Sequence, residues 1–150
     1  MNKQQIKESL RQHLFESKSK GDAAGVLILC LKTDKVLLLL RAAGGRGGNT
    51  WNLVAGGIEE GETVLEGLKR EVTEEMSINP DRIDYKLIKK VDIPEDNITF
   101  HYYEGFTNSE FIPKLCDENT DYGWYSKDEL PSPLYPDLQS KLDKIWKSQT

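Results

Sequence analysis

The segment "TVLEGLKREVTEEM", residues 63–76, constrains the fold most strongly because its apolar and charged residues separate at a helical period. At about 100° per residue, one narrow arc of such a helix is apolar and consists of Leu65, Leu68 and Val72. Thr63 is a good N-cap, and Glu66 three residues later completes a capping box. Asn79-Pro80 marks a turn shortly afterwards, so we predict a helix from residue 63 to about residue 76.

A neighbouring arc of the same helix carries charge and consists of Arg70, Glu71, Glu74 and Glu75. Carboxylates at this spacing repel one another, and each like-charge pair destabilises a helix by roughly a few tenths of a kcal/mol. A hard divalent cation such as Mg²⁺, which prefers carboxylate and carbonyl oxygens, would convert this repulsion into attraction. The alternative is a solvated acidic face, which is what most charge runs are. The residues that precede the helix decide between the two.

The rest of the chain predicts strands between helices. An amphipathic helix is expected at residues 3–18, within an N-terminal region of residues 1–20, because apolar residues recur every four positions at Ile6, Leu10 and Leu14. Apolar and aromatic runs predict strands or extended segments at residues 23–32, 35–42, 51–57, 84–93, 97–106 and 122–126. A C-terminal helix is predicted from the apolar face formed by Leu138, Leu142 and Ile145. These elements predict an α/β fold with a mixed sheet covered by helices on both faces.

Length and charge limit the classes of function. The chain has 150 residues and a formal net charge of −5, which fits one domain and argues against a broad nucleic-acid footprint. The opening "MNKQQIKESL" lacks the apolar core of a signal peptide, and the longest apolar runs are too short to cross a bilayer. Cys30 and Cys116 make neither a disulfide framework nor a metal knuckle. We therefore expect a cytoplasmic enzyme or binding domain, with no membrane partner, that occupies residues 1–150.

The spacing of glycine and glutamate around the predicted helix resembles the Nudix box, G-x5-E-x7-R-E-U-x-E-E-x-G-U. Eight of its nine specified positions match over residues 56–78, and these are Gly56, Glu62, Arg70, Glu71, Val72, Glu74, Glu75 and Ile78. The runs "LLLLR" before the box and "WNLVAGG" leading into it are also similar to Nudix sequences. The resemblance implies a single MutT-like Nudix hydrolase domain, an α/β/α sandwich with a mixed sheet and an added N-terminal helix.

Three positions depart from the family pattern. Ser77 replaces the second box glycine just past the helix, where the backbone tends to want a positive φ, and this is expected to cost about 1 kcal/mol. Val54 stands where many members have proline, and Ala55 stands where many have another glycine. The family uses the backbone carbonyl at position 55 as a metal ligand, and alanine still supplies a carbonyl.

The resemblance implies a divalent-metal mechanism. Mg²⁺ is the expected cofactor, with Mn²⁺ as an alternative, and the implied ligands are Glu71, Glu74, Glu75 and the Ala55 carbonyl. Glu74 and Arg70 are assigned to the catalytic set, and Arg70 can brace a carboxylate through its rigid donor fork. Glu62, the first glutamate of the box, is implied to support the geometry of the loop and helix.

Glu118 is assigned as the third catalytic residue, either as the base for the attacking water or as a further metal ligand. It lies in "KLCDENTDYGWYS", in the polar segment before the last predicted strand. Many Nudix enzymes carry a glutamate there that approaches the metal from opposite the box helix. The alternative is a solvent-exposed loop glutamate, and the other candidates for the base are Glu62, Glu71 and Glu110.

Substrate contacts are expected from residues around the box. Arg41 ends a strand and is a candidate phosphate partner, although an arginine that snorkels to solvent would look the same in the sequence. Aromatic side chains that could stack a nucleobase, but that are more often core residues, are Trp51, Tyr102 and Tyr103. Gly56 and Glu62, both in the box, are also expected to bind the substrate. The two histidines, His13 and His101, have no carboxylate partner that the sequence identifies, so neither is assigned a role.

The leading function is Mg²⁺-dependent hydrolysis of the pyrophosphate bond of a nucleoside diphosphate linked to another moiety. The substrate classes left open are ADP-ribose or a nucleotide sugar, a dinucleoside polyphosphate, and a nucleoside triphosphate. The alternative is a non-catalytic Nudix-fold module that senses a nucleotide, but such a module has no need of all three helix glutamates. The expected partner is therefore a small-molecule nucleotide rather than nucleic acid, and homodimer formation is left open.

Overall fold

The structure is a computed structural model that describes residues 21–45 and 47–148. Its strands are β1 (Gly21–Cys30), β2 (Lys35–Arg41), β3 (Trp51–Asn52), β4 (Val54–Gly57), β5 (Asp84–Ile93), β6 (Ile98–Thr107) and β7 (Asn119–Tyr125). Its α-helices are α2 (Val64–Met76) and α3 (Leu138–Ile145), and 3₁₀ turns occur at Pro80–Arg82 and Pro94–Asp96. The helix expected at residues 3–18 lies outside the described residues.

The described strands form one mixed sheet. Neighbouring strands follow the order β3-β2-β1-β6-β5, while β4 pairs with β1 and β7 pairs with β2. β1 and β6 run parallel over ten paired positions, from Gly21 opposite Ile98 to Cys30 opposite Thr107. The other strand pairs are antiparallel. The predicted mixed sheet is therefore confirmed.

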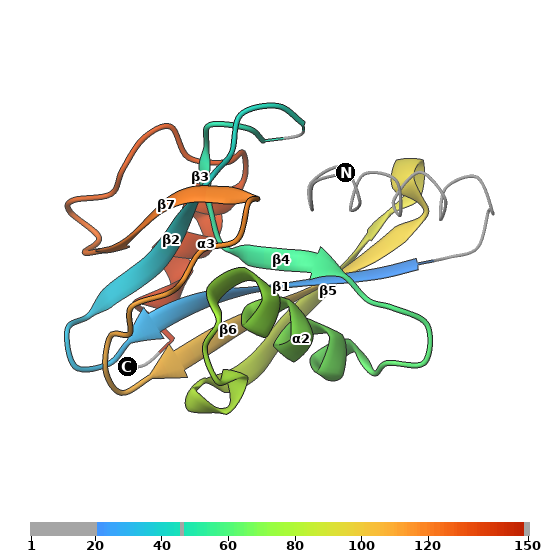
Figure 1. Ribbon diagram of the computed structural model, residues 1–150, viewed down its shortest axis with the longest axis horizontal. Helices are drawn as coiled ribbons and strands as arrows, with labels where there is room; N and C mark the ends of the chain where they lie inside the picture. Colours follow the sequence, from blue (N-terminus) through green and yellow to red (C-terminus); the bar gives the residue numbers. More distant parts are fainter. Residues whose placement is uncertain (1–20, 46, 149–150) are drawn as a thin grey trace.

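Two hydrophobic clusters cover the two faces of this sheet. Side chains of β1 alternate between them, so that Val26 and Ile28 pack with Leu68 and Val72 of α2. The intervening residues of β1 face the other way and join the cluster of α3, which contains Leu27, Leu29, Leu138, Leu142 and Ile145. Figure 1 shows α2 in front of the sheet and α3 behind it. This arrangement is the expected α/β/α sandwich.

β6 is enclosed more completely than its sequence suggests. Its apolar and polar residues alternate at the start, yet the polar side chains of Thr99, His101 and Glu104 are buried together with the aromatic ones. The reason is the position of the strand, since β6 lies between β1 and β5 and both faces of the sheet are covered. The alternation of apolar and polar residues therefore shows which residues share a face of β6. It does not show that either face is exposed to solvent.

The ends of α2 agree with the sequence prediction. The Thr63 hydroxyl accepts a hydrogen bond from the Glu66 backbone N–H at 3.1 Å, and the Glu66 carboxylate accepts one from the Thr63 backbone N–H at 2.9 Å. Ser77 closes the helix at φ 54° and ψ 40°, which is the positive φ expected there. No helix in the described part of the chain is long and apolar enough to cross a membrane.

Candidate active site

The carboxyl group of Glu71 lies directly against the backbone of β4. Gly56 pairs with Ala24 of β1, and a Cβ atom built on Gly56 would overlap the Glu71 carboxyl group. A larger residue at position 56 would therefore displace the Glu71 side chain from this place. Only 3% of the surface of Glu71 is exposed, and the value for Glu75 is the same. The glutamates of α2 thus do not form a solvated acidic face, because two of them are enclosed by the fold.

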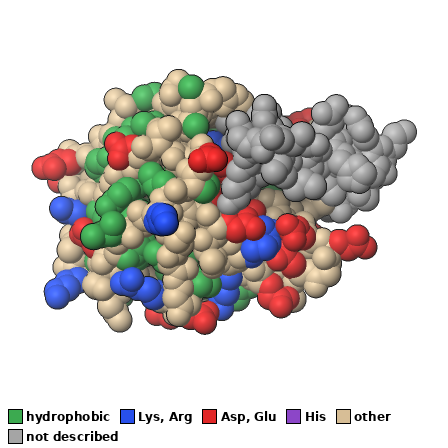
Figure 2. Space-filling model, viewed as in Figure 1, with side chains coloured by type: hydrophobic (Ala, Val, Ile, Leu, Met, Phe, Trp, Pro, Cys, Tyr) green, Lys and Arg blue, Asp and Glu red, His purple; other side chains and the backbone are tan. Residues whose placement is uncertain are grey.

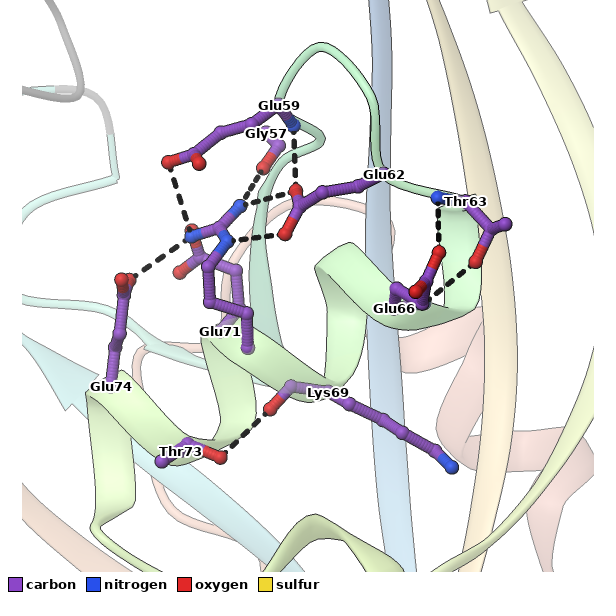
Figure 3. A network of polar contacts seen from close by, with 10 residues as sticks. Gly57, Glu59, Glu62, Thr63, Glu66, Lys69, Glu71, Thr73 and Glu74 are labelled. Carbon is purple, nitrogen blue, oxygen red and sulfur yellow. Dashed lines mark hydrogen bonds and ion pairs between the residues drawn. The ribbon is translucent and has the colours of Figure 1, made fainter.

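Arg70 lies at the centre of a network of acceptors from the helix and the preceding loop. Its Nε donates to Glu62 Oε2 at 2.8 Å, and its Nη2 donates to Glu62 Oε1 at 3.1 Å and to the Gly57 carbonyl at 2.9 Å. Its Nη1 donates to Glu71 Oε1 at 3.0 Å and to Glu74 Oε2 at 3.2 Å. Figure 3 shows these groups turned toward a single guanidinium group.

This network fixes the loop between β4 and α2. Glu62 accepts a further hydrogen bond from the Glu59 backbone N–H at 2.8 Å, so the loop is tied to the helix through one bidentate pair. The hydrogen bonds from Arg70 lower the pKa of Glu62 below its ordinary value. The same pair, followed by the negative charge of Glu71, raises the pKa of Arg70. Both groups are therefore ionised at neutral pH, and the bridge persists.

The acidic groups differ in their access to solvent. The side chain of Glu74 is 38% exposed, whereas those of Glu71 and Glu75 are enclosed. Figure 2 shows acidic side chains gathered around a basic one over α2 and the loop before it. Of the three glutamates Glu71, Glu74 and Glu75, one is therefore accessible and two are held by packing.

Glu118 lies in a turn immediately before β7, and 2% of its surface is exposed. Its backbone carbonyl accepts a hydrogen bond from the Ala42 N–H at 2.8 Å, and the next residue, Asn119, pairs with Arg41 of β2. The two long-range contacts bring the backbones of Arg41 and Glu118 together where β2 ends and β7 begins. The alternative of a solvent-exposed loop glutamate is therefore wrong. β7 also begins earlier than predicted, at Asn119, because it pairs along β2 as far as Arg41.

Comparison with known proteins decides the family, since the family model described as NUDIX domain matches residues 19–145. The chain belongs to the Nudix family. A curated mouse relative, "Oxidized purine nucleoside triphosphate hydrolase", is 28% identical over an alignment of 129 residues that covers 80% of this chain and 74% of the relative.

Solved Nudix structures share the fold. A NUDIX hydrolase from Nitrosomonas europaea matches with a TM-score of 0.72 and 19% identity, over 87% of this chain and 72% of that chain. An Ap4A hydrolase from C. elegans matches with a TM-score of 0.63 and 16% identity, over 85% of this chain and 94% of that chain. This Nudix protein is an enzyme that acts on pyrophosphate bonds, and the family acts on small nucleotide substrates and generally uses divalent cations.

The donor set of the Nudix box fits a hard cation. Its members are all oxygen donors, and the close approach of the Glu71 carboxyl group to Gly56 is a cradle that any larger residue would fill. As arranged here, no three His, Cys, Asp or Glu side chains among the described residues gather closely enough to hold a metal ion. Instead, Glu71 and Glu74 both accept hydrogen bonds from Arg70 Nη1.

The aromatic candidates for nucleobase stacking lie in the core of this Nudix hydrolase. Trp51 belongs to the α3 cluster and contacts Tyr125 edge to face, with 5.4 Å between the ring centroids. Tyr103 belongs to the α2 cluster and contacts Tyr85 in the same way, at 6.5 Å. Tyr102 is buried on the face of α3. Their burial favours packing over stacking on a substrate.

Two contacts in the structure have no signal in the sequence. His101 Nε2 lies 2.8 Å from Asp22 Oδ1, so the buried histidine has a carboxylate partner 79 residues away in the sequence. Glu59 and the Gly57 carbonyl also contact Arg70, although neither is a specified position of the box. The first contact depends on the parallel pairing of β1 with β6. Local periodicity carries no signal of that pairing.

Proposed function

We propose that this Nudix hydrolase cleaves the pyrophosphate bond of a nucleoside diphosphate linked to another moiety, with Mg²⁺ as its cofactor and Mn²⁺ as a substitute. The observation that carries the proposal is the enclosure of Glu71 against Gly56 of β4 and of Glu75 on the same helix, together with the accessible Glu74. Burying carboxylates is costly, and at Glu71 the hydrogen bond from Arg70 Nη1 offsets that cost. A structural helix could have used apolar residues at both enclosed positions.

The cation would be held by oxygen atoms of Glu71, Glu74, Glu75 and the Ala55 carbonyl. When bound, a divalent cation neutralises phosphate charge and stabilises the leaving phosphate. Arg70 keeps Glu62, Glu71 and Glu74 within one network of hydrogen bonds, and so it positions the carboxylates rather than touching the substrate.

Glu118 is proposed as the base. In the reaction, a water oxygen forms a bond to phosphorus, the bond from phosphorus to the bridging oxygen breaks, and one proton of the water passes to the Glu118 carboxylate. The burial of Glu118 favours this role because packing holds the carboxylate in one place before β7. Arg41 pairs with Asn119, next to Glu118, and is proposed to bind a phosphate oxygen.

The proposal is tested with a panel of purified substrates and wild-type protein. The panel contains ADP-ribose, a nucleotide sugar, a dinucleoside polyphosphate, nucleoside triphosphates and one oxidised purine nucleoside triphosphate, because the mouse relative is named for that last class. Each reaction is run with Mg²⁺, with Mn²⁺ and with EDTA, and the phosphate products are separated by chromatography. We expect cleavage of at least one class with either metal and none with EDTA.

The result also separates the enzyme from a nucleotide sensor. A sensor would bind one of these nucleotides in a calorimetric titration and release no phosphate product from it. Binding without turnover for every class, in the presence of Mg²⁺ and Mn²⁺, would overturn the proposed activity.

A further inference from the structure

A β-bulge lies where β2 ends and β7 begins. Leu40 stands opposite Asp121 in the strand register, and the next residue, Arg41, stands opposite Asn119. Thr120 is skipped, so β7 has one residue more than β2 at this point. A bulge re-aims a side chain, and bulges are common next to active sites. This one places the buried Asn119, rather than the exposed Thr120, opposite Arg41.

Asn119 carries an enclosed amide whose donor is not used. Only 8% of its surface is exposed, and its Nδ2 has no hydrogen-bond partner within the part of the chain that the structure describes. An amide nitrogen has two N–H donors, and buried donors are paired in nearly all native proteins. The residue before it is Glu118, the proposed base. The fold therefore keeps an unused donor next to the proposed chemistry, where an acceptor on a ligand would satisfy it.

Alternation along β2 shows on which face of the sheet the bulge lies. Leu37 and Leu39 belong to the α2 cluster, and Arg41 continues the alternation two residues later. In β7, Tyr122 stands opposite Leu39 and packs against the same cluster. Since Asn119 stands opposite Arg41, both β7 residues lie on the face of the sheet that α2 covers.

This face continues to the Nudix box without crossing the sheet. Gly56, where the box carboxylate is enclosed, alternates with Val54 and Asn52 along one extended segment. Val54 belongs to the α2 cluster, and Asn52 stands opposite Leu39. On its other side, Leu39 stands opposite Tyr122. A ligand that contacts the box glutamates can therefore reach the bulge along a single face.

Tyr122 presents an aromatic ring beside the amide. It is half-buried, and it makes no ring contact with another of the described residues. Trp124, on the same face, is used in the core instead, because its ring meets that of Phe111 at 5.1 Å between centroids and its Nε1 donates to the Phe111 carbonyl at 3.0 Å. Tyr122 and Asn119 stand opposite residues two positions apart in β2, which separates them by about 7 Å along the strand.

A ring and an amide at this separation suit a nucleobase, since the ring stacks on its face and the amide bonds to its edge. The amide then discriminates by the group on that edge. Hypoxanthine and guanine present a carbonyl oxygen, which accepts a hydrogen bond, where adenine has an amino group, which donates one. An amino group facing the Asn119 donor leaves both groups unpaired, and a site built for a hydrogen bond rejects such a ligand.

We propose that Asn119 and Tyr122 form the nucleobase subsite and that it selects a base with a carbonyl group over adenine. Asn119 Nδ2 donates to the carbonyl oxygen, and the Tyr122 ring stacks on the base. The inference rests on the proposed function, because that function brings a nucleotide to the box. It narrows each of the open substrate classes by its base, in favour of inosine or guanosine derivatives.

The first experiment measures binding and needs neither turnover nor metal. Inosine monophosphate and adenosine monophosphate, which differ at the selected group, are titrated calorimetrically in EDTA into the wild type and its variants. We expect the wild type to bind the inosine compound about tenfold more tightly. Asn119→Leu should remove the preference by weakening the inosine compound alone, and Asn119→Asp, whose carboxylate only accepts, should reverse it. Asn108→Leu, at an exposed position after β6, is the matched control and should bind as the wild type does.

Tyr122→Leu separates stacking from edge recognition. It should weaken both compounds by about tenfold and leave their ratio unchanged, because every base has a face on which a ring can stack. Equal binding of the two compounds by the wild type, or binding of neither, would overturn the subsite. An unchanged ratio in Asn119→Leu would also overturn it, since a structural role of Asn119 weakens both compounds alike.

The second experiment tests whether the subsite acts on substrates. kcat/KM is measured with Mg²⁺ for inosine triphosphate and adenosine triphosphate, with the wild type and Asn119→Leu. We expect the wild type to favour the inosine compound and Asn119→Leu to reduce that preference about tenfold. An unchanged preference in the variant would overturn the role of Asn119 in substrate selection. If the wild type cleaves no compound of the whole panel, the proposed function fails, and the titration still decides whether Asn119 and Tyr122 bind a base.

Discussion

The two helices that cover the sheet differ in what they bury. α2 encloses Glu71 and Glu75 alongside Leu68, Val72 and Met76, whereas the buried face of α3 consists of Leu138, Leu142 and Ile145 alone. The N-terminal ends of the two helices also differ in how they are capped. α2 begins with a complete capping box, but Asp137 at the start of α3 has a φ of 69° and makes no side-chain capping hydrogen bond. One helix is fixed closely and carries charge into the fold, and the other covers the sheet with apolar residues.

This difference indicates a division of labour between activity and stability. A carboxylate that must meet a cation has to be held to within a fraction of an ångström, which requires fixed helix ends and a supporting network such as that of Arg70. An apolar face tolerates small shifts, because its contribution depends on the area removed from water. We therefore expect substitutions on α2 to change turnover and substitutions on α3 to change the free energy of unfolding.

The largest effect on stability is expected from Leu142→Ala on α3. The side chain is fully buried in the α3 cluster, so its truncation should lower the free energy of unfolding by about 2–5 kcal/mol. Urea titration followed by circular dichroism measures this change. At a temperature well below the new midpoint, kcat should stay within about twofold of the wild type. A large loss of kcat in protein that is still folded would show that α3 takes part in activity and would break the division.

Glu74→Gln tests the expectation that substitutions on α2 change turnover. It should lower kcat at least about a hundredfold, which corresponds to about 2.7 kcal/mol, because it removes charge from a proposed metal ligand. The melting temperature should change little, since the side chain is 38% exposed. Glu60→Gln, at an exposed position of the preceding loop, is the matched control and should retain full activity. Near-wild-type activity of Glu74→Gln with Mg²⁺ would mean that the ligand set is wrong.

Glu118→Gln sharpens the comparison by testing a buried carboxylate that lies outside both helices. It should reduce kcat by about ten- to a thousandfold with little change in melting temperature, because the amide keeps the shape of the side chain but cannot accept the proton. Asp117→Asn changes the exposed neighbour in the same turn and should leave kcat unaltered. If kcat of Glu118→Gln is unchanged at saturating Mg²⁺, the base must be sought among Glu62, Glu71 and Glu110.

The elements and the box could be read from the sequence because their signals are local. The capping box of Thr63 and Glu66, the apolar arc of α2 and the periodic face of α3 each lie within one short segment. Their positions in the structure agree with those expected. The positive φ of Ser77 was likewise predictable from the place of a glycine in the family pattern.

Burial and long-range partners could not be read in the same way. The sequence places Glu71 and Glu75 on a charged arc, yet both are enclosed, and Glu71 lies against Gly56 of β4. The partner of His101 and the burial of Glu104 depend on which strands neighbour β6. Sheet order is set by packing over the whole chain, so no window of the sequence contains it.

The smallest effect is expected from Ser77→Gly, at the point where α2 departs from the family pattern. Ser77 adopts φ 54° and ψ 40°, and its backbone N–H donates to the Thr73 carbonyl at 2.9 Å. Glycine reaches this left-handed conformation without strain from a Cβ atom, but it also gains freedom in the unfolded chain. The two effects oppose each other, so the free energy of unfolding should rise by no more than about 1 kcal/mol. Thr73→Gly, inside the same helix, should lower it by roughly a few tenths of a kcal/mol in the same urea titration, because threonine is itself a weaker helix former than alanine. A clear loss of stability in Ser77→Gly would mean that the serine side chain stabilises the end of the helix. Glycine, the family residue, would then be the less favourable residue at position 77.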